Sequence, residues 1–255
     1  MRSPRLVAGI VGGVVGLGVV AALLLLVLAP RGPVIDSFEA PNEPDLPRWA
    51  PAAPEPVAAE DPGAGIQGRV DAAWAEQTAA ATGIPIRALV AYAGAAMFKA
   101  ETMPECRISW STLAGVGKIE SDHGRFGGSV FDSDGTSTPP IYGVALDGGS
   151  TNIVEDSDDG ELDGDPDFDR AVGPMQLIPQ TWRNWHVDGG GDGVEDPQNI
   201  DDAVTAAANY LCRSSVDMDT EEGWRAAVSA YNSSDTYLSN VAAAALGYNE
   251  AADRP

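Results

Sequence analysis

Basic residues are scarce in this sequence: 15 Lys and Arg stand against 38 Asp and Glu, which gives a formal net charge of −23. A surface of this sign repels phosphate backbones, so the composition argues against nucleic acid as a partner. It equally argues against electrostatic attraction to anionic lipid or other polyanions. A neutral substrate or a metal cation suits such a charge better. The hydrophobic residues, 44% of the chain, are enough for the core of one or two domains.

Cysteine and histidine are also rare, with two of each. Cys106 and Cys212 lack the CxxC spacing of zinc and dithiol redox sites, and His123 and His186 stand too far apart to suggest a metal pair. In an oxidising compartment the cysteines predict one disulfide, which closes a loop of about 100 residues and contributes about 4–5 kcal/mol in the chain-entropy model. Two buried free thiols are the alternative. We expect both histidines at the surface.

Charged residues are absent from residues 6–29, an apolar segment that follows Arg2 and Arg5. Its length is enough to span a bilayer as a helix, which takes about 20 residues. Basic residues before the segment favour a cytoplasmic stub, residues 1–5, and a chain that continues outside the cell membrane. The sequence therefore predicts a single-pass anchor with an extracytoplasmic domain. The alternative is a signal peptide cleaved near Leu28-Ala29-Pro30, where proline directly after the small residue makes a poor site.

Hydrophobic periodicity is absent from residues 30–63, which are dominated by proline, alanine and acidic residues. Such a composition cannot pack a core, so it predicts a disordered tether between the membrane and the folded domain. The domain itself is expected to occupy residues 64–255.

Strand signals are nearly absent from the domain, apart from a short piece around residues 141–146. Alanine-rich segments with helical periodicity, two of them with proline in the first turn, predict a mainly α fold. The expected helices cover residues 66–82, 85–102, 110–123, 179–185, 201–212, 221–232 and 236–249.

One acidic insertion interrupts these helices. Residues 147–169 hold eight aspartates and two glutamates, with no Lys, Arg or His. A solvated loop is the plain interpretation of such a run. However, DSDG at 132–135, DSDDGELDGD at 156–165 and DGGGDG at 188–193 all place carboxylates around glycine turns, as calcium loops do.

The last of these segments comes nearest to a calcium-binding loop. With Asp188 as position 1, Asp192 stands at position 5, although position 3 is Gly190 and position 12 is Asn199 in place of glutamate. A structural calcium ion in the acidic loops is thus the alternative to a solvated loop, with Asp188 and Asp192 as its candidate ligands.

A carboxylate stands where a helix should be apolar, in GVGKIESDHG. At about 100° per residue, Leu113, Val116 and Gly117 share one stripe with Glu120. Burial disfavours the charged form, so Glu120 is expected to keep a proton near neutral pH and to donate it to an acetal or glycosidic oxygen. Asp122 lies off the stripe and is expected to stay ionised. A structural role, in which Glu120 bonds a backbone group or an arginine, is the alternative.

Four segments that are specific in combination follow one another along the chain: WSTLAGVGKIESDHGRFGG, RAVGPMQLIPQTW, DGGGDGVEDPQNIDDAVTAAANYLC and GWRAAVSAYNSS. Together they resemble the lytic murein transglycosylases of the membrane-bound B type, within the lysozyme-like superfamily. The resemblance runs from roughly Pro85 to Tyr248. It implies a lysozyme-like helical fold and cleavage of the β-1,4 bond between N-acetylmuramic acid and N-acetylglucosamine in peptidoglycan glycan strands.

The resemblance also assigns roles to residues. It implies that Glu120 works alone, first as general acid on the glycosidic oxygen and then as base on the C6 hydroxyl, which closes a 1,6-anhydro ring without water and without a required cofactor. It implies substrate-binding or orienting roles for Gln176, Tyr231, Asn232, Ser121 and Tyr92. A muramidase that hydrolyses the same bond with water and a non-catalytic wall-binding module are the alternatives.

Overall fold

The computed structural model describes residues 47–149, 152–215 and 217–254. The chain divides into two units, residues 1–42 and 43–255. The predicted anchor, residues 6–29, lies outside the described residues. Within the described part, no single helix is long and apolar enough to cross a membrane; Ala72–Thr82 and Ile86–Thr102 meet that test only when joined across a bend of 118°.

Helices dominate the described part of the chain, as the sequence predicts. All the expected helices are present, with ends that shift by a few residues. The first one begins at residue 72 instead of 66, because the carboxylate of Asp71 accepts the amide of Trp74 at 2.8 Å and caps it there. The helices are α1 (Ala72–Thr82), α2 (Ile86–Thr102), α3 (Trp110–Ser121), α4 (Pro179–Trp185), α5 (Ile200–Ser214), α6 (Glu221–Tyr231) and α7 (Asp235–Ala252), with 3-10 turns η1 (Gln67–Arg69) and η2 (Phe126–Gly128).

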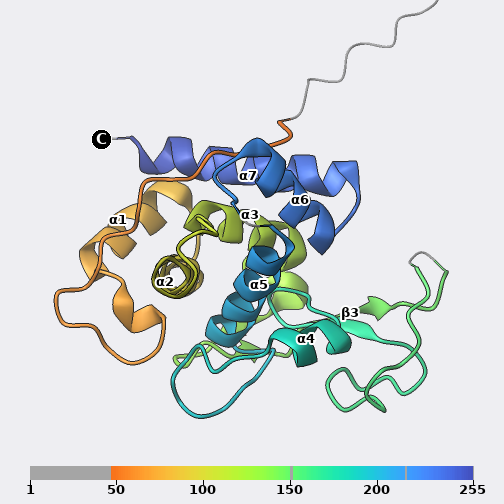
Figure 1. The fold of residues 1–255 in the computed structure, drawn as a ribbon. Helices are drawn as coiled ribbons and strands as arrows, with labels where there is room; N and C mark the ends of the chain where they lie inside the picture. Colours follow the sequence, from red (N-terminus) through yellow and green to blue (C-terminus); the bar gives the residue numbers. More distant parts are fainter. Residues whose placement is uncertain (1–46, 150–151, 216, 255) are drawn as a thin grey trace, which may run out of the picture. The chain divides into compact units, whose positions relative to one another are not determined.

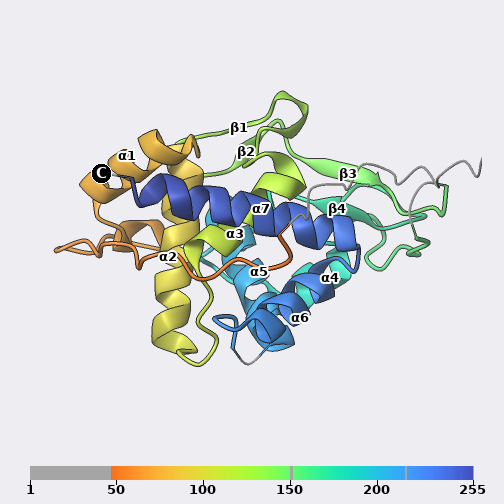
Figure 2. The same cartoon turned by 90° about the horizontal axis from the view of Figure 1, so that it is seen from above.

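Helix α3 lies at the centre of the domain, in contact with α2, α5 and α7 (Figure 1). Seen from above, α7 runs across α3 (Figure 2). The approach of α2 to α3 depends on Gly117, because a Cβ there would lie 2.0 Å from the hydroxyl oxygen of Tyr92. Close packing of this kind fixes the direction of α3, and with it the position of the residues in its last turn.

A disulfide joins Cys106, in the connection between α2 and α3, to Cys212 near the end of α5. The predicted pairing is therefore confirmed. The bridge links two segments separated by 106 residues and lies within the apolar core, since both cysteines are buried.

The strands form two small antiparallel pairs. In the first, β1 (Val130–Phe131) pairs with β2 (Ser137–Thr138) in the register Val130↔Thr138. In the second, β3 (Tyr142–Ala145) pairs with β4 (Arg170–Val172), with Tyr142 opposite Val172. The strand expected around residues 141–146 is confirmed as β3; the other three are too short to leave a periodic signal.

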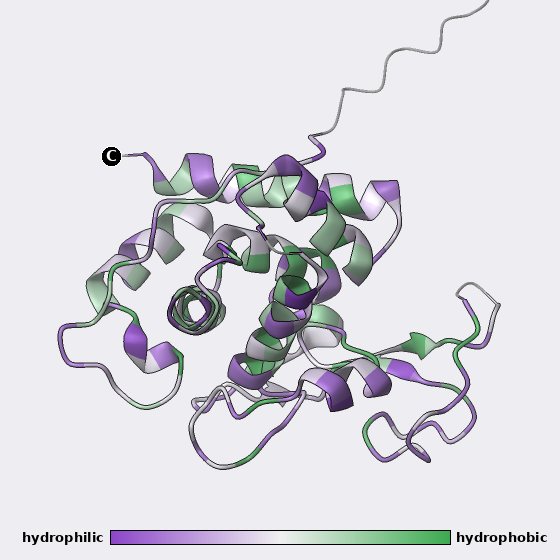
Figure 3. Cartoon of the chain, in the orientation of Figure 1, coloured by the Kyte–Doolittle hydropathy of each residue, from purple (hydrophilic) through white to green (hydrophobic). Residues whose placement is uncertain are grey.

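The acidic insertion is the connection from β3 to β4. Coloured by hydropathy, it is mostly hydrophilic, whereas the central helices carry the hydrophobic residues (Figure 3). It is held by backbone bonds between distant parts of the loop, including the amide of Val154 to the carbonyl of Leu146 at 2.8 Å.

The tether prediction is wrong for residues 47–63, which lie along the domain. Ala50 and Ala53 are buried, at 1% and 8% exposure. The indole N–H of Trp110 donates to the carbonyl of Pro54, and the side-chain amide of Asn249 donates to that of Pro51. Alanine is small enough to fit a groove between helices without any periodic pattern, so composition alone does not reveal the contact.

Candidate active site

Glu120 lies in the last turn of α3, at the edge of the buried face that the sequence predicts. Leu113 and Val116 on that face are fully buried, and Glu120 itself is partly exposed. Burial raises the pKa of Glu120 to about 7, and a hydrogen bond from Tyr237 acts in the opposite direction. Near neutral pH the carboxyl group therefore exists in both its protonated and its ionised form.

Tyr237, in the first turn of α7, is the direct partner of this carboxyl group. Its hydroxyl donates to Oε1 of Glu120 at 2.5 Å. Burial raises the pKa of the Tyr237 phenol well above its usual value, and the charge of Glu120 adds to the effect. Tyr237 therefore remains a donor near neutral pH, and with Oε1 accepting its hydrogen bond, the acid proton of Glu120 belongs on Oε2.

The chain breaks sharply after Glu120. Asp122, His123 and Gly124 follow one another with positive φ angles of 52°, 59° and 79°. Gly124 is required there, because a Cβ would lie 2.2 Å from the ring of Phe131. The break ends α3 one residue beyond the glutamate and leaves that residue at the helix terminus.

Asp122 is held by two cations. Its carboxylate forms ion pairs with Lys118 and with Arg125 at 3.0 Å. Burial acts to raise the pKa of Asp122, but the hydrogen bonds from Arg125 and Lys118 outweigh it and keep the pKa below its usual value. Asp122 is ionised, as the sequence predicts.

The GPMQ turn after β4 joins the end of α3 to the end of α6. The hydroxyl of Ser121 donates to the carbonyl of Pro174 at 2.6 Å. The hydroxyl of Tyr231 donates to the carbonyl of Met175 at 2.6 Å. Gln176 follows with φ of 48°, and its Nε2 donates to the carbonyl of Gly173 at 3.0 Å. Glu120, Tyr231 and Gln176 are thus brought together from three separate parts of the sequence.

A cavity of about 260 Å³ opens beside this turn. Gln176, Tyr231 and Tyr210 line it, and the rings of Tyr210 and Tyr231 lie 5.7 Å apart. Burial, followed by the charge of Glu120, raises the pKa of Tyr231 well above its usual value. The cavity therefore offers an amide and two tyrosine side chains, and Glu120 is not among the residues that line it. A larger cavity of about 460 Å³ lies elsewhere, between Arg69, Glu101 and Asp188, and does not include Glu120.

Tyr92 and Ser121 are buried, so neither presents a surface to a ligand, and for Ser121 this fits the orienting role rather than a substrate contact. Tyr92 is 0% exposed and Ser121 2% exposed. Tyr92 points into the domain because it faces Gly117 of α3, and Ser121 uses its hydroxyl on Pro174 while accepting the amide of Gly124. Both residues position the end of α3.

His123 is buried, contrary to the surface position expected for it. Its Nδ1 lies 3.1 Å from the hydroxyl of Tyr92 and its Nε2 lies 2.8 Å from that of Tyr248. Burial, with the charges of Lys118 and Arg125, lowers its pKa to about 4. A neutral imidazole donates to one phenol and accepts from the other, so His123 holds the break after Glu120 rigid. His186 is exposed, as expected.

Asn232 is exposed at the end of α6, next to Tyr231. Its side-chain oxygen accepts the amide of Ser234 at 3.0 Å, so the side chain shapes the turn that leads to α7. Its side-chain amide nitrogen is the group left for the substrate binding that the resemblance implies.

Three tyrosines at the site are not found from the sequence. They are Tyr237 at Glu120, Tyr210 at the cavity and Tyr248 at His123. Tyr237 meets Glu120 across 117 residues of sequence, and Tyr248 meets His123 across 125. A tyrosine in the first turn of a predicted helix carries no local signal that it faces an acid. Only the packing of α7 on α3 brings these groups together.

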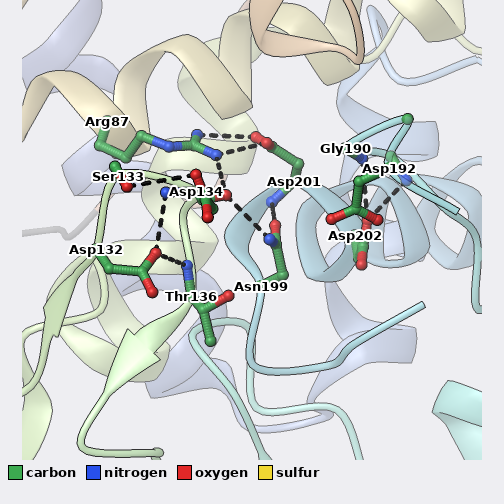
Figure 4. A network of polar contacts seen from close by, with 12 residues as sticks. Arg87, Asp132, Ser133, Asp134, Thr136, Gly190, Asp192, Asn199, Asp201 and Asp202 are labelled. Carbon is green, nitrogen blue, oxygen red and sulfur yellow. Dashed lines mark hydrogen bonds and ion pairs between the residues drawn. The ribbon is translucent and has the colours of Figure 1, made fainter. Parts of the chain in front are cut away.

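The DGGGDG loop is organised by carboxylates that accept its own amides. Asp188 accepts the amides of Gly191 and Gly193, at 2.5 and 2.8 Å. Asp202, in α5, accepts those of Gly189 and Gly190 at 2.7 and 3.0 Å (Figure 4). Calcium binding by Asp188 and Asp192 stays a prediction: the described carboxylates whose oxygens lie within 4.8 Å of one another are a different group, in the acidic insertion.

A buried ion pair fixes the start of α5 beside this loop. Arg87 of α2 donates to both carboxylate oxygens of Asp201, at 2.9 and 2.5 Å, and to the carbonyl of Asp134 (Figure 4). Asn199 caps α5 and also donates to Asp134. The network joins α2, the 132–136 turn and α5, and it is scaffold for the site.

Residues 168–251 match the family model described as transglycosylase SLT domain. The match covers about a third of the chain and includes Gln176, Tyr231 and Tyr237, while Glu120 lies before it. No curated protein and no solved structure matches the chain. The match supports similarity to the lysozyme-like transglycosylase superfamily, enzymes that cleave glycosidic bonds of peptidoglycan.

Proposed function

We propose that the protein is a lytic transglycosylase in which Glu120 is the single catalytic acid and base. The substrate is the β-1,4 bond between N-acetylmuramic acid and N-acetylglucosamine, and the product carries a 1,6-anhydro ring. The observation that carries the proposal is the state of Glu120: a partly buried carboxyl group with a pKa of about 7 and a phenol donor on one oxygen.

The first step needs an acid. Glu120 donates its proton to the glycosidic oxygen as the bond from that oxygen to C1 of the muramic acid breaks. A carboxylate then forms at Glu120, and the short hydrogen bond from Tyr237 stabilises it as the charge appears. The positive charge that develops on the sugar lies beside this carboxylate.

The second step needs a base at the same place. The carboxylate of Glu120 takes the proton from the C6 hydroxyl, and that oxygen bonds to C1. One C–O bond has then been broken and one formed, water is not consumed, and Glu120 is protonated again for the next cycle.

The surroundings of Glu120 favour this single-residue chemistry. A retaining glycosidase places a second carboxylate about 5 Å from the first, and an inverting enzyme places it farther away to hold a water. The nearest carboxylate in sequence, Asp122, is bound to Lys118 and Arg125. The groups that shift the pKa of Glu120 are the apolar core and Tyr237, neither of which is a carboxylate.

Gln176, Tyr231 and Asn232 are the proposed substrate contacts. Nε2 of Gln176 is bound to Gly173, so its Oε1 is the group available to accept an N-acetyl N–H. Tyr231 presents its ring to the cavity, because its hydroxyl donates to Met175. Asn232, exposed beside them, has its amide N–H groups free for a sugar hydroxyl or carbonyl once its oxygen has capped Ser234.

We also propose that the protein is anchored in the cell membrane with its folded domain outside. Residues 6–29 anchor the chain in the cell membrane, and the disulfide between Cys106 and Cys212 suits an oxidising compartment outside it. Deleting residues 1–29 should move the protein from the membrane fraction to the soluble fraction. Continued sedimentation with membranes would reject the anchor.

The experiment compares wild type, Glu120→Gln and a matched control, Glu250→Gln, on purified peptidoglycan sacculi. Glu250 is an exposed glutamate near the end of α7, on the same helix as Tyr237, so it matches the chemistry of the change at Glu120. We expect Glu120→Gln to bind sacculi normally and to release muropeptides about 10²–10⁴-fold more slowly, because general acid–base catalysis contributes that much. The control should match wild type. Binding without cleavage by wild type would instead favour the wall-binding module.

A further inference from the structure

Three carboxylates of the acidic insertion converge on one point. One oxygen each of Asp156, Asp158 and Asp169 lies within 4.8 Å of the others. Asp158 and Asp169 are buried, at 7% and 0% exposure, and Asp156 is partly buried. Buried carboxylates repel one another unless a cation or a proton lies between them.

Two of the three are held rigidly by hydrogen bonds from the loop. Asp169 accepts the amide and the hydroxyl of Ser157, at 2.8 and 3.0 Å. Asp156 accepts the amides of Asp159 and Gly160, at 2.8 and 3.0 Å. The loop therefore fixes the direction of these carboxylates without neutralising their charge.

The third carboxylate is incompletely satisfied. The side chain of Asp158 is 0% exposed. Its Oδ2 accepts the amide of Leu162 at 2.9 Å, whereas its Oδ1 has no hydrogen-bond partner in the described part of the chain. A buried carboxylate oxygen without a partner is costly, and here it belongs to a member of the converging group.

The positive charge near the group falls short of the negative charge. The guanidinium of Arg183 lies 3.9 Å from Oδ2 of Asp158, but its side chain is 44% exposed and also donates to the carbonyl of Ser157. A fourth carboxylate, Asp163, is 2% exposed close by and accepts the backbone amide of Arg170 at 2.6 Å. Among the described residues, one partly solvated cation, Arg183, thus faces four carboxylates.

We propose that Asp156, Asp158 and Asp169 bind a calcium ion, with Oδ1 of Asp158 as the ligand left free for it. Carboxylate oxygens are the ligands of hard cations. Calcium suits an irregular loop with several crowded carboxylates better than magnesium, which demands a regular octahedron and keeps most of its water. This site is separate from the DGGGDG loop and does not depend on the reaction proposed for Glu120.

The ion has a structural consequence for the catalytic turn. Asp169 directly precedes β4, and β4 leads into the GPMQ turn that binds Ser121 and Tyr231. A calcium ion on Asp169 therefore ties the insertion to the strand that ends beside Glu120.

A shared proton is the alternative way to satisfy the group. A proton between Asp156 and Asp158 would remove the repulsion without a metal. The two accounts differ in a simple way: a proton makes the loop insensitive to calcium, whereas the proposed site makes it sensitive.

The test uses the full chain in detergent micelles, as wild type, Asp158→Asn and Asp188→Asn. The last variant removes a carboxylate of the DGGGDG loop and is the matched control. Each protein is titrated with calcium chloride, and its thermal unfolding is compared in excess chelator, in calcium and in magnesium. Protease Glu-C then reports on the insertion itself, because Glu155 and Glu161 are exposed within it.

We expect calcium to raise the melting temperature of wild type and of Asp188→Asn, to protect Glu155 and Glu161 from cleavage, and to act more strongly than magnesium. Asp158→Asn should lose affinity by at least about tenfold, since even indirect partners of a metal contribute that much. In chelator it should be at least as stable as wild type, because it removes a buried charge. That result separates loss of the site from misfolding.

The proposal is overturned if calcium changes neither the melting temperature nor the cleavage of wild type. It is equally overturned if the calcium response survives in Asp158→Asn and disappears in Asp188→Asn, since the ion would then bind the DGGGDG loop. An equal response to magnesium would overturn the choice of calcium.

Discussion

The helices around Glu120 and the loops between β1 and α5 are held together by different forces. In the helical region, α2, α3 and α7 pack through fully buried apolar residues such as Leu113 and Val241. In the loop region, hydrogen bonds to carboxylates hold the turns together. Backbone amides donate two or more such bonds to each of Asp132, Asp156 and Asp188 within their own turns. The acidity of this protein is therefore partly an internal scaffold and not only a surface charge.

Glu120 in the helical region and Asp188 in the loop region respond to pH in opposite directions. Glu120 has a raised pKa, so the stability linked to it is complete below its unfolded pKa near 4.5 and is lost as the pH rises through about 7. Hydrogen bonds from loop amides, the first of them from Gly193, lower the pKa of Asp188, so the stability linked to it is present above its usual pKa and is lost in acid. Above neutral pH, ionisation of the buried Glu120 therefore lowers the stability of the fold, whereas ionised Asp188 contributes to it.

The largest expected effect comes from opening the disulfide of the helical region. Replacing Cys106 and Cys212 by alanine frees a loop of 106 residues and should lower the free energy of unfolding by about 4–5 kcal/mol. Urea unfolding followed by tryptophan fluorescence measures the loss. A change below about 1 kcal/mol would show that the unfolded chain is already restricted and that the loop model does not apply.

Next in size is the stability cost of the catalytic acid. Glu120→Gln keeps an acceptor for Tyr237 but carries no charge, so it should raise the free energy of unfolding by about 1–3 kcal/mol at pH 8. The gain should shrink towards zero well below pH 4.5, where the wild-type carboxyl group is protonated in both the folded and the unfolded state. Equal gains at both pH values would mean that charge burial is not the cause.

Tyr237→Phe should have a smaller effect, on rate. It removes the donor that stabilises the Glu120 carboxylate, so turnover should fall about tenfold, as expected for a hydrogen bond to a charged group. Because this bond lowers the pKa of Glu120, its loss should also move the alkaline limb of the pH–rate profile to higher pH. A lower rate with an unmoved limb would assign Tyr237 a purely structural role.

The smallest effect is expected in the loop region. Asp132→Ala removes an acceptor for the amides of Asp134 and Thr136, at 3.0 and 2.9 Å, on an exposed turn. The free energy of unfolding should fall by only about 0.5–1 kcal/mol, because water replaces the lost partner. Asp132→Asn, which keeps the oxygen, serves as control. A loss as large as that of the disulfide would mean that the loops and helices unfold as one unit.

Much of the helical region could be predicted from sequence because its signals are local. Alanine-rich periodicity located every helix, and the stripe of Leu113, Val116 and Gly117 placed Glu120 at a buried face. The two cysteines allowed one pairing. These features depend on neighbours within a few turns of helix, where spacing determines direction.

The rest depends on contacts that spacing does not encode. Tyr237 reaches Glu120 from another helix, and His123 is buried only because Tyr92 and Tyr248 enclose it. Tyr92 was expected at the cleft, yet the helix turns it towards Gly117. Residues 47–63 likewise find their place through small side chains such as Ala50, which carry no periodic signal.

The central claim is that Glu120 acts alone and that the C6 hydroxyl, not water, completes the reaction. The most direct measurement is mass spectrometry of the muropeptides that the chain beginning at Glu43 releases from sacculi, because residues 43–255 form a unit of their own. The account predicts products lighter by one water than reducing muropeptides, in wild type and absent with Glu120→Gln. Reducing muropeptides of full mass would contradict it and would show that water attacks C1.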